Sequence, residues 1–217
     1  MKLLFLHGWG FDASFWEPLR AALPEFAHEA DDRGYFGDPH TLAPDRMSTP
    51  VLAVTHSFGT MRLLADPPPG LVGLVAINGF DHFSARPDRP GVPMRVLDRM
   101  LRRFDEDPAP VLAEFRRQIG CHDDFEMCEP EPLREDLLAM RDAHLSLSPV
   151  PVLAIHGSAD PLLPPDLRAA TFTRGTHPAR RMDSPEGGHL LPRENPALCA
   201  AAIRGMIASL PAGPATA

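Results

Sequence analysis

Short apolar runs alternate along this chain with segments in which apolar residues recur at helical spacing. Runs that are apolar on both faces of an extended chain are typical of strands buried within a mostly parallel sheet, and they occur at residues 3–6, 51–54, 71–77 and 152–155. Weaker strands are predicted at residues 26–31 and 179–183. Helices are predicted between the strands, at residues 15–23, 57–64, 165–172 and from 195 onward. The alternation predicts an α/β fold with about six sheet strands flanked by helices.

The pattern changes after Phe80, where helical periodicity continues without any strand. Three amphipathic segments carry apolar residues at helical spacing, at residues 96–104, 111–119 and 133–138. We therefore predict an α/β core made of residues 1–83 and 149–211, with residues 84–148 inserted as a helical cap over the strand ends. Residues 212–217 are small and proline-bearing, and we predict a loose tail.

The start of the first predicted helix has a recognisable signal. Ser14-Phe15-Trp16-Glu17 has the S-x-x-E form of a capping box, which confines Pro18 to the first turn. Phe15, Leu19 and Leu23 would then form the buried face of this helix.

Composition narrows the classes of protein that are possible. A hydrophobic content of 44% with 23% charged residues is ordinary for a globular domain with a sizeable core. The formal net charge of −8 argues against binding to nucleic acid or to an anionic membrane, and no run approaches the length of a membrane span. Cys121, Cys128 and Cys199 form no C-x-x-C pair, so we predict neither a disulfide framework nor a metal site. These features favour a cytoplasmic protein without a cofactor.

Three of the predicted strands are followed by residues that together could form a nucleophilic triad. Ser57 lies in Thr55-His56-Ser57-Phe58-Gly59, a strand-to-helix turn that differs from G-x-S-x-G in having Thr55 at its first position. Asp160 follows the strand at 152–155, and His189 follows the strand at 179–183. Parallel strands bring their carboxyl ends to one edge of a sheet, so these side chains can meet. Asp166 and Asp183 are alternative acids, although Asp160 alone comes directly after an apolar strand.

The triad residues occur in the order serine, acid, histidine, within or beside four motifs: HGWG at 7–10, THSFGT at 55–60, HGSAD at 156–160 and GGH at 187–189. In this order and in these motifs the chain resembles the α/β-hydrolase superfamily over residues 2–210. The resemblance implies an α/β-hydrolase fold and a serine hydrolase. It also implies Ser57 as nucleophile, Asp160 as orienting acid, His189 as base, and an oxyanion hole made by the backbone N–H groups of Trp9 and Phe58. The chain lacks the N-terminal strand pair of many members. His56 and His7 are candidate pocket residues, although the glycine turn at His7 also suits a structural role.

The predicted cap indicates a substrate. Residues 97–108 and HGWG resemble the carboxylesterases that act on pimeloyl-[acyl-carrier protein] methyl ester in biotin synthesis. A general carboxylesterase for short acyl esters is the alternative, and a non-catalytic binding protein on the same fold is a further one.

Four arginines of the first cap segment share one predicted helical face, and they are a candidate contact for an acidic acyl-carrier protein: Arg95, Arg99, Arg102 and Arg103. Arg116 and Arg117 could extend this face. The same arginines could equally form a solvated surface that is balanced by Asp98 and the acidic run at 105–107.

Overall fold

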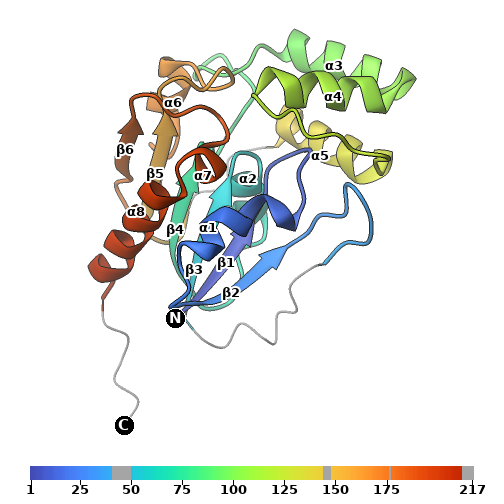
Figure 1. Cartoon of the computed structure of the whole chain (residues 1–217). Helices are drawn as coiled ribbons and strands as arrows, with labels where there is room; N and C mark the ends of the chain where they lie inside the picture. The colour runs from blue at the N-terminus through green and yellow to red at the C-terminus, as the bar shows by residue number, and fades with distance from the viewer. Residues whose placement is uncertain (41–49, 144–147, 176, 212–217) are drawn as a thin grey trace.

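A parallel sheet forms the centre of the molecule (Figure 1). The computed structural model describes residues 1–40, 50–143, 148–175 and 177–211, so the predicted tail at 212–217 lies outside the described residues. Within these ranges the sheet has six strands in the order β2-β1-β3-β4-β5-β6, and every pairing is parallel. The strands are β1 (Lys2–Leu6), β2 (Ala27–Asp31), β3 (Val51–His56), β4 (Leu71–Ile77), β5 (Val152–Gly157) and β6 (Arg180–Ser184). The predicted fold class and number of strands are confirmed.

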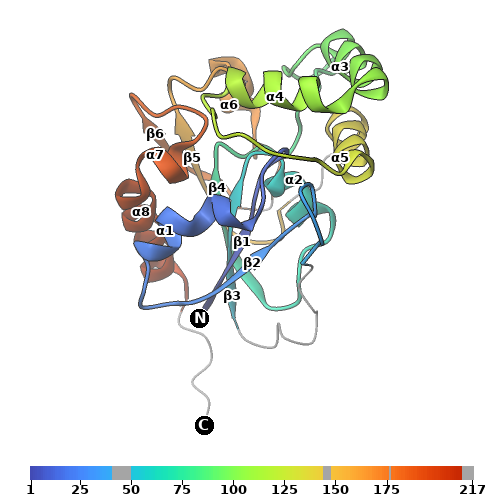
Figure 2. The same ribbon diagram turned by 45° about the vertical axis from the view of Figure 1, so that its right-hand side comes forward.

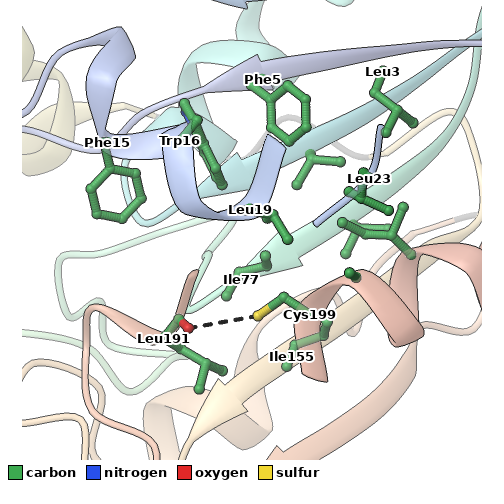
Figure 3. Packing of buried hydrophobic residues seen from close by; sticks show 14 of the residues in the cluster. Leu3, Phe5, Phe15, Trp16, Leu19, Leu23, Ile77, Ile155, Leu191 and Cys199 are labelled. Carbon is green, nitrogen blue, oxygen red and sulfur yellow. Dashed lines mark hydrogen bonds between the residues drawn. The ribbon is translucent and has the colours of Figure 1, made fainter. Parts of the chain in front are cut away.

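Helices cover both faces of this sheet. They are η1 (Ala13–Trp16), α1 (Glu17–Ala21), α2 (Gly59–Ala65), α6 (Pro165–Ala170), α7 (Leu191–Glu194) and α8 (Pro196–Ser209). Alternate residues of β1 enter different cores: Phe5 belongs to a buried cluster that includes Trp16, Leu19 and Cys199 (Figure 3), whereas Leu4 belongs to a separate cluster with Leu63 of α2. This alternation follows from the period of two in a strand, and it explains why β1 is apolar throughout.

The predicted capping box at the first helix is wrong. The chain enters a 3₁₀ turn, η1, before α1, and the Asp12 carboxylate accepts the hydrogen bond from the backbone N–H of Ser14 at 2.8 Å. Asp12 therefore caps this segment, because its side chain reaches the free amide two residues on. The predicted buried face is confirmed, since Phe15, Leu19 and Leu23 are all buried.

Three helices lie between β4 and β5 in sequence: α3 (Met94–Glu106), α4 (Pro108–Gln118) and α5 (Pro130–Asp142). Figures 1 and 2 show them together beyond one end of the sheet. Leu97, Leu112 and Leu133, one from each helix, form a buried cluster with Trp9 and Phe58 from loops at the ends of β1 and β3. The helices therefore lie at the edge where the predicted site residues are found. Their treatment as a separate cap domain stays a prediction.

No helix in the described ranges combines the length and apolar character needed to cross a membrane.

Candidate active site

Ser57 lies on a strained turn between β3 and α2. Its φ angle is +51°, in the left-handed region that side chains other than glycine rarely adopt. The helix begins two residues later at Gly59, where a Cβ atom would lie 2.5 Å from the carbonyl oxygen of His7. Thr55, which replaces the first glycine of the motif, is fully buried, and its hydroxyl is hydrogen-bonded to that of Thr60 at 2.6 Å. The turn thus accommodates Thr55 and keeps the sharp strand-to-helix geometry.

His189 and Asp160 form a buried pair. The distance from His189 Nδ1 to Asp160 Oδ2 is 2.7 Å, and the two side chains are 1% and 0% exposed. Because a carboxylate only accepts hydrogen bonds, Nδ1 carries the proton and Nε2 of the neutral ring is an acceptor. Nε2 is buried and has no hydrogen-bond partner in the described part of the chain. The alternative acids Asp166 and Asp183 are both exposed, which leaves Asp160 as the carboxylate that orients this ring.

His56 connects this pair to the turn that holds Ser57. Its Nε2 donates to the backbone carbonyl of His189 at 2.9 Å, and the two imidazole rings lie 4.8 Å apart. The His56 ring also stacks on Phe15 at 4.4 Å. Burial is the main reason that the pKa of His56 is well below its ordinary value, and the nearby His189 lowers this pKa further. A neutral His56 therefore fixes the loop of His189 next to Ser57.

The loop after β1 packs against the same turn. A Cβ atom on Gly8 would lie 2.9 Å from Cβ of Ser57, so only glycine allows this approach. Trp9 is 1% exposed, and its indole Nε1 donates to the carbonyl of Leu133 at 2.8 Å. No hydrogen bond within the described ranges uses the backbone N–H of Trp9 or of Phe58. Both amides are thus available as the donors of an oxyanion hole, which stays a prediction.

The expectation that His7 and His56 line a pocket is wrong, because both side chains are 0% exposed. His7 accepts a hydrogen bond at Nε2 from the backbone N–H of Arg33 at 3.0 Å and donates through Nδ1 to the carbonyl of Gly8 at 2.9 Å. Burial also lowers the pKa of His7. Both histidines therefore hold loops at the sheet edge.

Asn78 is a structural part of the site that the sequence did not reveal. It is fully buried with a φ of +46°. Its amide nitrogen donates to the carbonyls of Gly188 and His189 at 2.8 and 2.9 Å, and its amide oxygen accepts from the backbone N–H of Gly157 at 2.7 Å. Asn78 therefore joins the ends of β4 and β5 to the His189 loop. The Asn-Gly pair after β4 was the available signal, but it indicated only the end of the strand.

All four arginines of the candidate carrier contact are exposed on α3. Arg103 donates to Glu114 at 2.6 Å, whereas Arg95, Arg99 and Arg102 form no ion pair with any described residue. Of the acids expected to balance this face, Asp98 pairs with Arg141 and Asp105 pairs with Arg134, whereas Glu106 and Asp107 are exposed and form no ion pair with a described residue. Arg95, Arg99 and Arg102 are therefore exposed cations without a directly bound acid among the described residues.

Arg116 departs from the expected extension of this surface, because it is only 7% exposed. Arg117 is exposed, as expected. Among the described residues no group of histidine, cysteine or acidic side chains is arranged to hold a metal ion.

Comparison with known proteins identifies the fold and the curated proteins that the chain resembles. No protein-family model matches the chain. A pimeloyl-[acyl-carrier protein] methyl ester esterase from Klebsiella pneumoniae subsp. pneumoniae is 27% identical over 183 residues, which cover 77% of this chain and 68% of that protein.

Two solved structures match over 96% of this chain and 92% of their own. They are an esterase from Exiguobacterium antarcticum, with a TM-score of 0.77 and 17% identity, and a bromoperoxidase from Bacillus anthracis, with a TM-score of 0.81 and 16% identity. At such identities the likeness to these structures establishes the fold. The chain has the α/β-hydrolase fold. Among curated proteins it resembles the pimeloyl-[acyl-carrier protein] methyl ester esterases.

Proposed function

We propose that the chain is a serine carboxylester hydrolase that works through an acyl-enzyme on Ser57. The observation that carries this proposal is the buried His189 ring, which is bound to Asp160 at Nδ1, has a free Nε2, and is tied through His56 to the turn of Ser57. A serine hydroxyl is a weak nucleophile, and a histidine base oriented by a carboxylate is the usual way to activate it.

In the proposed reaction, Nε2 of His189 takes the Ser57 proton while Oγ attacks the ester carbonyl. The carbonyl oxygen becomes an oxyanion that accepts hydrogen bonds from the amides of Trp9 and Phe58. Collapse of this intermediate breaks the ester C–O bond, and the alcohol leaves with the proton held by His189. Water, deprotonated by the same nitrogen, then attacks the acyl-enzyme and releases the carboxylic acid and free Ser57.

The proposed substrate is an acyl ester carried on an acyl-carrier protein, with pimeloyl-[acyl-carrier protein] methyl ester of biotin synthesis as the first choice. Two observations support it: the curated relative that is 27% identical acts on this ester by its name, and α3 presents exposed arginines without ion pairs among the described residues. A cationic face on a chain of net charge −8 would steer an acidic carrier protein toward the helices above the site.

The test uses two double charge reversals and two substrates. Arg99→Glu with Arg102→Glu removes the proposed contact, and Arg180→Glu with Arg204→Glu is the control of equal charge at exposed positions on β6 and α8. We expect the first variant to lose about tenfold or more in kcat/KM on the carrier-linked ester at low salt, with a smaller loss at high salt. Both variants should hydrolyse p-nitrophenyl butyrate at the wild-type rate.

The other outcomes separate the alternatives. Turnover of small esters without turnover of the carrier-linked ester would favour a general short-chain carboxylesterase. A folded wild-type protein that neither hydrolyses esters nor reacts with a fluorophosphonate at Ser57 would be a binding protein. Equal losses in both double variants would remove the arginines of α3 from the proposal.

A further inference from the structure

Arg116 on α4 is a buried cation without a carboxylate partner. It is 7% exposed, and none of the ion pairs formed by the described residues includes it. Burying a guanidinium costs free energy unless its N–H groups and its charge are compensated. The charge of Arg116 helps to lower the pKa of Asp123 without forming an ion pair with it, so the direct contacts of the guanidinium are with neutral groups.

These contacts are with aromatic rings and backbone carbonyls, while the buried Nε–H of Arg116 has no hydrogen-bond partner among the described residues. The guanidinium carbon lies 5.4 Å from the ring centres of Phe11 and Phe36 and 5.6 Å from that of Phe125, within the range of cation–π attraction. One terminal nitrogen donates to the carbonyl of Gly10 at 2.8 Å, and the other donates to the carbonyl of Asp123 at 3.2 Å. Arg116 thus joins the loop after β1 to the segment between α4 and α5.

The bond to Gly10 matters because this residue follows Trp9, whose backbone N–H is a proposed oxyanion donor. Gly10 has a φ of +76°, and a Cβ atom there would lie 2.7 Å from Leu112 of α4. On the other side of the loop, the Trp9 indole donates to Leu133 of α5. The loop is therefore held by two hydrogen bonds to the helices above the sheet, at the Trp9 side chain and at the Gly10 carbonyl, just after the Trp9 backbone N–H.

We propose that Arg116 is a positioning residue for the oxyanion hole: it clamps the Gly10 carbonyl and thereby sets the direction of the Trp9 amide. The inference rests on the proposed function. An oxyanion donor stabilises the transition state more than the bound ester, so a shift of this amide should lower kcat and leave KM nearly unchanged. A merely structural arginine would change the amount of folded protein and not the rate per active site.

The experiment compares Arg116→Met with Arg180→Met, an exposed arginine on β6 that serves as the matched control. Active sites are counted by the end point of fluorophosphonate labelling, and kcat and KM are measured with p-nitrophenyl butyrate. We expect Arg116→Met to lose about 10- to 100-fold in kcat per labelled site with little change in KM. Its affinity for a trifluoromethyl ketone, which mimics the tetrahedral intermediate, should fall by a similar factor. Arg180→Met should match wild type.

Wild-type kcat per labelled site in Arg116→Met would overturn the proposal, and so would a KM effect alone. Arg116→Lys keeps the charge but cannot reach both carbonyls, so it provides the same measurement if Arg116→Met does not fold: reduced kcat per site supports the clamp, and unchanged kcat overturns it. If wild type and Arg180→Met are folded but neither labelled nor active, the proposed function fails instead.

Discussion

At the scale of single residues, the hydrogen bond between Asp160 and His189 fixes which ring nitrogen carries the proton. We predict that Asp160→Asn loses about 10,000-fold in kcat with the fold intact, because the amide can donate to Nδ1 and so favour the wrong tautomer. The measurement is ester hydrolysis together with a thermal melt. Asp166→Asn and Asp183→Asn are the controls, since both residues are exposed. Near-normal activity of Asp160→Asn would show that another group orients His189.

A second prediction at this scale concerns how His56 makes the stability of the fold depend on pH. Burial holds the pKa of His56 well below its ordinary value, so the folded protein keeps this ring neutral while the unfolded chain takes up a proton below about pH 6.5. The unfolded state then binds more protons, and the free energy of unfolding must fall as the pH drops below this point. Above it, His56 contributes no pH dependence.

Urea unfolding at about pH 7.5 and about pH 5.5 measures this effect, and a single site of this kind contributes about 1 kcal/mol over one pH unit. His56→Gln keeps an N–H donor for the His189 carbonyl but cannot titrate, so its stability should depend less on pH. His7 and His156, whose pKa values are also lowered by burial, leave a residual slope. Identical slopes in the two proteins would contradict the assignment to His56.

At the scale of elements, two helical glycines should respond in opposite directions to the same substitution. Gly205 lies within α8, where an added Cβ atom would have no neighbour within 4 Å. Gly205→Ala should therefore raise the free energy of unfolding by about 0.5–1 kcal/mol through helix propensity and reduced freedom of the unfolded chain. Gly59→Ala should be destabilising, because the new methyl group meets the carbonyls at the end of β1. Urea midpoints check both, and effects of equal sign would contradict this account.

The elements also explain how far the sequence could predict the structure. Strands buried on both faces are encoded by consecutive apolar residues, so β1, β3, β4 and β5 were predicted almost to their ends. Polar residues after β5 and after the weaker β6 predicted Asp160 and His189 as partners, and the structure brings them into contact. Asn78 and Arg116 could not be predicted in their roles, because the bonds of Asn78 to Gly157 and His189 and the bond of Arg116 to Gly10 span 79 to 111 residues and leave no local pattern.

At the scale of the whole molecule, the sheet pairs strands that are distant in sequence. Val152 of β5 lies beside Leu74 of β4, and the three helices α3, α4 and α5 occupy the chain between them. The site thus needs β3, β5 and β6 in one sheet, while the helices above it are built from local contacts.

Parallel pairing across such a long segment loses loop-closure entropy before the stabilising contacts between the strands form, and this makes folding slow. We predict that, after dilution from urea, helical circular dichroism recovers before Ser57 becomes reactive toward a fluorophosphonate. Coincident recovery of the two signals would contradict this order. During synthesis, the same connectivity means that the proposed reaction could not begin in a growing chain until β6 and the His189 loop after it have left the ribosome.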